Sequence, residues 1–218
     1  MKAMLYADWM NLRRSMKALL AVVVVMVLAS VTTGNGLSFL LAMLCMLSLM
    51  VPATLMSSDS AYGWDKLSLS LPVSRRDVVS SKFAISLLVN LTVVALGMIC
   101  IAGMHAFGGD AMAEDMMGML ACEAVGLALM GIEFVLVLRF GPERGRYFLI
   151  GVVWVPIILL TVVKKHPAFN GLVQAVGGMD SWPVGQLAAF FGGLVIVGAI
   201  VYAVCWRIGV GIYRKKEL

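Results

Sequence analysis

Long apolar runs recur from one end of the chain to the other, and the polar segments that separate them are short. A helix that crosses a bilayer needs about 20 mostly apolar residues, whereas an independent soluble domain needs at least roughly 50 residues. No polar segment here reaches the second length. Hydrophobic residues make up 61% of the 218 residues and charged residues 13%, against roughly 45–50% apolar residues in soluble domains. We therefore predict a single all-α, polytopic transmembrane domain over residues 1–218.

The apolar runs predict six transmembrane helices. They lie at about residues 18–33, 37–56, 83–104, 116–138, 148–163 and 184–206. Before them, Leu5, Trp9, Leu12 and Met16 share one helical face within residues 1–17, which predicts an amphipathic interfacial helix. A cleaved secretory signal peptide is the alternative for this start. It would leave five spans and put the chain ends on opposite sides of the membrane, which the basic C-terminus disfavours.

Lys and Arg residues cluster in alternate gaps between the apolar runs. Of the 17, fifteen lie at the N-terminus, between the second and third spans, between the fourth and fifth spans, or at the C-terminus, and the other two are Lys164 and Lys165. Cytoplasmic loops carry such an excess of Lys and Arg, so we predict that both termini are cytoplasmic. We also expect residues 139–146 to form a short basic loop between the fourth and fifth spans. The net charge of +5 is thus better explained by membrane topology than by nucleic-acid binding. The four cysteines lie in apolar runs without paired spacing, which predicts no metal site.

Residues 59–82 form the longest polar interruption, between the second and third spans. Ser74 followed by Asp77 matches a capping box, in which the Ser side chain accepts a hydrogen bond from a backbone N–H of the first helical turn. Pro72 keeps the residue before it out of the helical region. We therefore expect the third transmembrane helix to begin near Arg75.

The same stretch carries more aromatic and aliphatic residues than membrane anchoring requires. Trp64, Leu67 and Leu71 share one face if the segment is helical, whereas Leu67, Leu69 and Leu71 share one face if it is a strand. Exposed Trp and Tyr are enriched in interaction surfaces. A solvated loop whose basic residues only set the topology is the alternative reading.

The order of residues in this stretch resembles the first cytoplasmic loop of type-2 ABC transporter permeases. The resemblance rests on an acid, then Gly63-Trp64, then Leu71-Pro72-Val73-Ser74-Arg75, Val78-Val79 and Lys82. The six-span layout and the amphipathic N-terminus are also similar. The resemblance implies that the stretch before Pro72 is a coupling helix docked on a cytoplasmic ATPase. The expected contact residues are Asp59, Tyr62, Trp64, Leu67, Leu71 and Arg75. It also implies that residues 1–17 are a connecting helix and residues 164–183 an external re-entrant element.

On this resemblance we expect the permease subunit of a bacterial ABC exporter in the cell membrane. The chain contains no GxxxxGK[ST] sequence, the loop that cradles nucleotide phosphates. We therefore expect ATP and Mg²⁺ to bind to the partner ATPase. This chain is expected not to be an enzyme and not to bind a cofactor. A second permease copy or homologue should complete the pathway as a homo- or heterodimer. The expected cargo is hydrophobic or amphipathic, such as a peptide, an antimicrobial or a lipid.

Two acids lie inside the fourth predicted span, Glu123 and Glu133. An ionisable residue within the membrane is costly and is a functional candidate. The alternatives are that Glu123 reaches water near the outer end, that Glu133 snorkels to the inner interface, or that both are paired in the interior. These acids make a proton-coupled secondary transporter that uses Glu123 or Glu133 the first alternative function. A membrane adaptor or immunity protein that moves no cargo is a separate alternative, which the sequence does not exclude.

Overall fold

The computed structural model describes residues 49–60, 74–106, 112–163 and 183–215, together with Tyr6, Trp9, Met10 and Val25. Within these residues the fold is all-helical and contains no strand, as predicted. The labelled helices are α4 (Arg75–Ala106), α5 (Met112–Phe140), α6 (Pro142–Val163) and α8 (Val184–Lys215), and residues 49–60 are also helical. In the described part of the chain, three helices are long and apolar enough to cross a membrane, at Arg75–Gly103, Asp115–Phe140 and Val184–Lys215. The total of six spans stays a prediction, because most of the first two lies outside the described residues.

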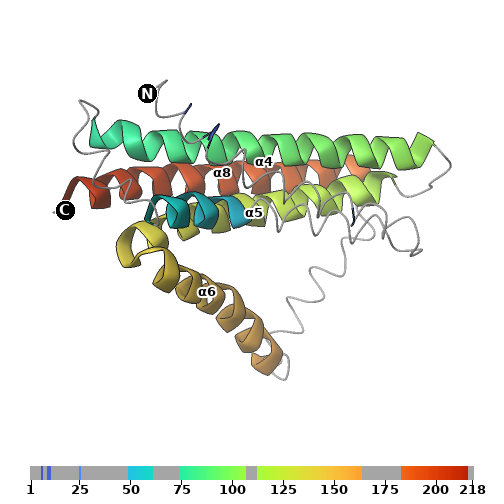
Figure 1. Ribbon diagram of the computed structural model, residues 1–218. Helices are drawn as coiled ribbons and strands as arrows, with labels where there is room; N and C mark the ends of the chain where they lie inside the picture. The colour runs from blue at the N-terminus through green and yellow to red at the C-terminus, as the bar shows by residue number, and fades with distance from the viewer. Residues whose placement is uncertain are drawn as a thin grey trace.

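Helices α4, α5 and α8 lie side by side in a bundle, and α6 leaves the bundle at an angle (Figure 1). Helices α5 and α8 run in the same direction. Successive glycine contacts show this, since Gly198 meets Ala124, Gly131 meets Tyr202, and Gly209 meets Leu138. Helix α4 runs in the opposite direction, because Phe83 stacks on Phe134 while Ile101 packs with Met119.

Close backbone contact joins α5 to α8. A Cβ atom on Gly198 would lie 2.5 Å from the carbonyl oxygen of Ala124. A Cβ atom on Gly131 would lie 3.1 Å from both the Cβ of Cys205 and the Cα of Tyr202. Small residues allow the backbones of membrane helices to approach in this way. The two glycines therefore set the spacing of the α5–α8 pair.

Helix α4 begins where the sequence predicts. The backbone N–H of Asp77 donates to Oγ of Ser74 at 3.1 Å, which satisfies one of the first-turn N–H groups. Arg75 is the first helical residue. The helix thus begins before the predicted apolar run, and its first turns carry charged residues.

The segment 139–146, which we expected to be a basic loop, is helical except at Gly141. Gly141 has a φ of 87°, and its N–H donates to the carbonyl of Val137 at 2.9 Å. This left-handed conformation suits glycine at a helix C-terminus, and Pro142 is well suited to the first position of the next helix. One residue therefore separates α5 from α6. Gly145 makes the corner tight, since a Cβ there would lie 2.7 Å from Cγ2 of Val137.

The main core lies between α4, α5 and α8. Phe83 stacks on Phe134 with ring centroids 4.2 Å apart and packs at 5.2 Å against Tyr202. A second apolar cluster joins the helix 49–60 to α4 through Val51, Leu55, Ile85 and Val89. The end of α4 is linked to the start of α5, because Nε2 of His105 lies 3.2 Å from Oδ2 of Asp115. This contact is at the end of the bundle far from Arg75.

Candidate functional site

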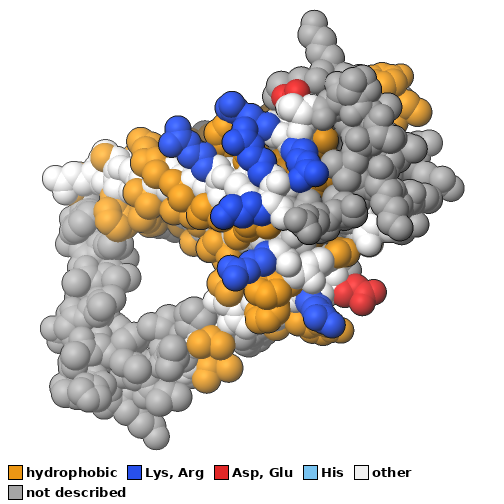
Figure 2. Space-filling view, turned by 90° about the vertical axis from the view of Figure 1, so that its left-hand side faces the viewer, with side chains coloured by type: hydrophobic (Ala, Val, Ile, Leu, Met, Phe, Trp, Pro, Cys, Tyr) orange, Lys and Arg blue, Asp and Glu red, His pale blue; other side chains and the backbone are white. Residues whose placement is uncertain are grey.

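Exposed Lys and Arg side chains gather at one end of the molecule, where α4 and α6 begin and α5 and α8 end (Figure 2). We call this the basic end. The exposed basic residues that the structure describes there are Arg75, Arg76, Arg139, Arg144, Arg207, Arg214 and Lys215. They come from four helices, so positions far apart in the sequence form one positive surface. This is the charge distribution expected at the cytoplasmic face of a membrane protein, and the orientation itself stays a prediction.

A buried ion pair lies just inside the basic end. Nζ of Lys82, in α4, donates to Oδ2 of Asp59, in the helix 49–60. Both residues are only 4% exposed. Removing a charge from water costs several kcal/mol unless an opposite charge and hydrogen bonds compensate it. The pair therefore holds together the two helices that flank the segment 61–73.

The start of α4 is also attached to the end of α8. Nη1 of Arg75 donates to the carbonyl oxygen of Arg214 at 2.9 Å, which satisfies one of the carbonyls that a helix leaves unbonded in its last turn. Further into the bundle, Nε1 of Trp206 donates to Oγ of Ser80 at 3.0 Å. The guanidinium of Arg76 lies 5.3 Å from the centre of the Trp206 ring, within the range of a cation–π interaction.

A third hydrogen bond between α4 and α8 lies deeper in the bundle. The hydroxyl of Tyr202 donates to the backbone carbonyl of Phe83 at 2.7 Å. Phe83 follows Lys82 directly, so this hydrogen bond is at the level of the buried ion pair. Three hydrogen bonds, donated by the side chains of Arg75, Trp206 and Tyr202, thus connect α8 to the first three turns of α4.

Polar residues continue along one face of α4 into the apolar interior. Lys82, Ser86 and Asn90 are spaced four residues apart, which places them on one helical face, and all three are buried. Nδ2 of Asn90 donates to Oε2 of Glu123 on α5 at 3.3 Å. A line of buried polar side chains therefore runs from Asp59 near the basic end to Glu123.

The structure places both intramembrane acids in the interior. Glu123 is 8% exposed and is hydrogen-bonded to Asn90, so it does not reach water at the helix end. Glu133 is 2% exposed, so it does not snorkel to the interface. Of the alternatives that the sequence leaves open, interior burial is the one observed. A role in transport or proton handling stays a prediction for both residues.

The predicted ATPase contacts fall into two groups. Asp59 is buried against Lys82, and Arg75 is exposed at the start of α4. The others, Tyr62, Trp64, Leu67 and Leu71, lie outside the described residues, so the docking assignment stays a prediction.

Sequence reasoning missed several residues at the basic end. Arg76 and Trp206 form the cation–π contact, and Arg207 and Arg214 lie beside it on α8. The spacing of Arg207 and Arg214 is a usable signal, since seven residues correspond to about two helical turns and so to one face. The contact between Arg76 and Trp206 has no such signal, because it depends on how two distant helices pack.

Comparison with known proteins identified one family. The family model described as "ABC-2 family transporter protein" matches residues 3–214 of this chain, which is nearly its whole length. The comparison with curated proteins and the comparison with solved structures gave no match.

Proposed function

This chain belongs to the ABC-2 transporter protein family, and we propose that it is the permease subunit of an ABC exporter driven by a separate ATPase. Membership of the family makes it a multi-pass membrane subunit of an ABC transporter. The proposal adds the coupling route, the direction of transport and the class of cargo.

The buried pair of Asp59 and Lys82 is the observation that carries the coupling route. We infer that the segment 61–73 holds the coupling helix and lies in the cytoplasm against the ATPase. The helices before and after this segment are bonded to each other inside the bundle. A displacement of the segment would therefore move the helix 49–60 and α4 together, instead of being absorbed at the loop ends.

The contacts between α4 and α8 would extend this movement across the subunit. Trp206 bonded to Ser80, and Tyr202 bonded to the carbonyl of Phe83, give α4 and α8 a polar connection in addition to apolar packing. ATP and Mg²⁺ would be bound by the ATPase, and a second permease copy or homologue would complete the pathway. The basic end would face the cytoplasm, with both termini on that side of the cell membrane.

The proposed cargo is hydrophobic or amphipathic. The exposed apolar side chains of the described helices support this class, because a pathway bordered by these faces offers few polar partners to a charged, water-soluble solute. A peptide, an antimicrobial or a lipid fits the description.

Purification of the tagged chain from its native membrane in mild detergent tests the proposal. We expect an ABC ATPase to co-purify in stoichiometric amount and to be lost from the double variant Trp64→Ala/Leu67→Ala. Leu69→Ala is the matched control, since it changes the same segment but lies on the opposite helical face from Trp64 and Leu67. An ATPase that stays bound with undiminished coupled activity in the double variant would show that the docking assignment is wrong.

A proton-coupled transporter is the second candidate, and the buried pair of Asn90 and Glu123 is the observation that favours it. A carboxyl group held inside a membrane helix is suited to binding and releasing a proton. This function requires cargo uptake driven by a pH gradient in vesicles without any ATPase. It also requires that uptake be lost in Glu133→Gln or Glu123→Gln. If neither ATP nor a pH gradient moved cargo in vesicles, a non-transporting adaptor or immunity role would remain.

A further inference from the structure

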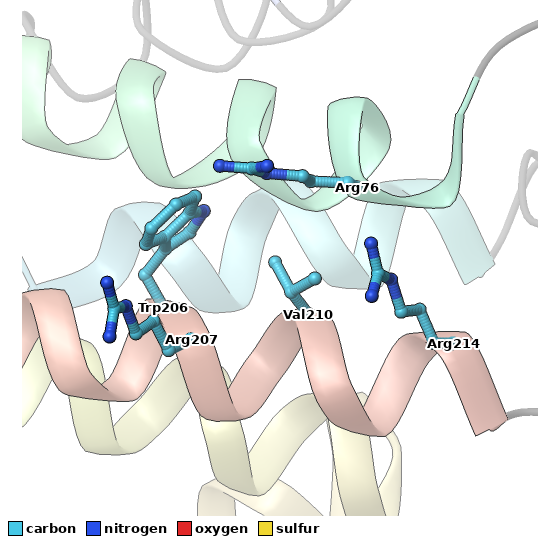
Figure 3. A pocket seen from close by; sticks show the side chains of 5 residues that line it. All are labelled: Arg76, Trp206, Arg207, Val210 and Arg214. Carbon is cyan, nitrogen blue, oxygen red and sulfur yellow. The ribbon is translucent and has the colours of Figure 1, made fainter.

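A basic pocket lies between α4 and α8 at the basic end of the bundle. Its volume is about 350 Å³, and it is lined by Arg76, Trp206, Arg207, Val210 and Arg214. Figure 3 shows Arg76 extending from α4 over Trp206, while Arg207, Val210 and Arg214 line the α8 side. Among the described residues, the lining thus contains three arginines and no acid. Within the part of the chain that the structure describes, no ion pair joins these arginines to an acid.

The pocket is held in shape by contacts that do not use the guanidinium groups of Arg207 and Arg214. The Trp206 ring is fixed by its hydrogen bond to Ser80, and the ring in turn positions Arg76. Arg214 accepts the hydrogen bond from Arg75 through its backbone carbonyl, so its side chain takes no part in that bond. Guanidinium groups bind phosphate oxygens through paired N–H donors, and three of them border this pocket. The ligand chemistry that suits the pocket is therefore an anionic phosphate group.

The apolar surface next to the pocket distinguishes a lipid phosphate from a free one. Ile196, Ile200, Arg207 and Arg214 are spaced by four or seven residues, so they lie along one face of α8. Ile200 is 57% exposed and Ile196 is 63% exposed. Moving from the chain end toward the interior, this face passes from two arginines to two exposed isoleucines. An amphiphile with an anionic head and an apolar tail matches that order.

The length of α8 between Arg207 and Arg214 also fits the thickness of the membrane interface. Seven residues of α8 between Arg207 and Arg214 span roughly 10 Å at 1.5 Å per residue. The polar layer on each side of a bilayer is about 5–8 Å thick. The two arginines therefore cover the depth at which lipid phosphates lie, with the isoleucines beyond them at the depth of the acyl chains.

We propose that this pocket binds the headgroup of an anionic glycerophospholipid, with one acyl chain lying along Ile200 and Ile196 of α8. Basic pockets between transmembrane helices bind such headgroups in other membrane proteins. The pocket lies beside Arg75, an expected ATPase contact, and shares Trp206 with the proposed coupling route. Lipid binding itself requires only that the basic end lie at a membrane surface.

Lipid competition tests the proposal on the full-length chain. The protein is purified in detergent, incubated with equal amounts of phosphatidylcholine and phosphatidylglycerol, re-isolated, and its bound lipids are quantified by mass spectrometry. We expect wild-type protein to be enriched in phosphatidylglycerol and Arg207→Gln/Arg214→Gln to lose most of that enrichment. Each arginine should account for about a fivefold change in the lipid ratio. Arg207→Lys/Arg214→Lys should keep part of it, which separates loss of charge from loss of fold.

Arg144→Gln is the matched control, because Arg144 is exposed at the same end but does not line the pocket. Undiminished enrichment in Arg207→Gln/Arg214→Gln, or an equal loss in Arg144→Gln, would overturn the proposal. A parallel titration with inorganic phosphate, against chloride at matched ionic strength, separates the two phosphate sources. Displacement of the lipid by phosphate but not by chloride would identify a site for the free ion instead of the lipid. None of these measurements needs ATP, an ATPase or cargo, so their outcome is independent of the exporter proposal.

Discussion

Lys82 and Asp59 are the described residues at which charge and burial conflict most directly, since opposite full charges meet at positions only 4% exposed. An apolar pair of similar volume often gives equal or greater stability than a buried ion pair. Stability alone therefore does not explain why the chain has charges here. A directional ion pair fixes the register of one helix against another, which apolar packing does poorly. That role suits the helix 49–60 and α4, which flank the segment proposed to receive the ATPase.

Lys82→Met should destabilise the protein by about 3–5 kcal/mol, because it removes one charge of a buried ion pair and keeps the other. Asp59→Leu/Lys82→Met should recover most of that loss, since it removes both charges together. Thermal unfolding of the wild type, the single variant and the double variant in one detergent gives the order of their stabilities. A double variant no more stable than the single one would contradict the ion-pair account.

At the scale of the helices, glycines serve two structural roles: some allow close helix packing, and one allows a left-handed turn. Gly198 and Gly131 permit the close approach of α5 and α8, whereas Gly141 permits the turn from α5 into α6. The first task depends on space and the second on backbone conformation. Substitution by alanine therefore tests a different physical term at each position.

Gly198→Ala should destabilise the α5–α8 pair by about 1–3 kcal/mol, the usual cost of overpacking. The added Cβ would lie 2.5 Å from the Ala124 carbonyl oxygen, so a backbone must move to admit it. Gly192→Ala on the same helix is the control, since nothing lies within 4 Å of its added Cβ. Thermal unfolding should separate the two variants. Equal midpoints would show that the helices have room at Gly198.

Gly141→Ala should cost about 1–2 kcal/mol, because an L-residue with a side chain is strained in the left-handed region. Its φ of 87° is the reason, since no atom lies within 4 Å of the added Cβ. Gly151→Ala, within α6 and equally unobstructed, should be neutral or slightly stabilising because alanine favours helix. The difference in thermal midpoint between the two variants measures the strain. If Gly151→Ala lowered the midpoint as much as Gly141→Ala, the corner would not depend on this conformation.

For the whole molecule, the features that the sequence predicts are those that depend on local pattern. The all-helical class follows from the apolar runs, and the start of α4 follows from Ser74 and Asp77. The corner at Gly141 was expected as a loop because Arg139, Gly141 and Pro142 together suggest an irregular polar segment. A glycine followed by a proline, however, also ends one helix and begins the next with no further residues.

The features that the sequence could not predict depend on which helices are neighbours. Asp59 and Lys82 were recognised as the ends of a polar stretch, but nothing in their spacing shows that they meet. The same holds for Trp206 with Ser80, and for Asn90 with Glu123. In each case the two residues lie on different helices, so only the packing of the bundle brings them together. Burial of Glu133 likewise depends on which face of α5 the other helices cover.

The proposed coupling route makes a prediction about the intact transporter. If movement of the segment 61–73 reaches α8 through its polar contacts with α4, Tyr202→Phe/Trp206→Phe should weaken coupling without preventing ATPase binding. Each substitution removes one hydrogen bond, worth about 0.5–1.5 kcal/mol, and keeps an aromatic ring in place. Cargo moved per ATP hydrolysed in vesicles should fall by about fivefold or more, the lower end of usual coupling energies.

His105→Leu provides the comparison that separates coupling from stability. It removes the contact with Asp115 at the opposite end of the bundle, and so perturbs a link between two helices that is not on the proposed route. We expect a comparable shift in thermal midpoint with an unchanged ratio of cargo to ATP. An equal loss of coupling in both variants would mean that the ratio follows general stability. An unchanged ratio in Tyr202→Phe/Trp206→Phe would mean that α8 receives its movement by another path. A loss confined to Tyr202→Phe/Trp206→Phe would place the route at the level of Lys82, where the buried ion pair and the Tyr202 hydrogen bond meet on α4.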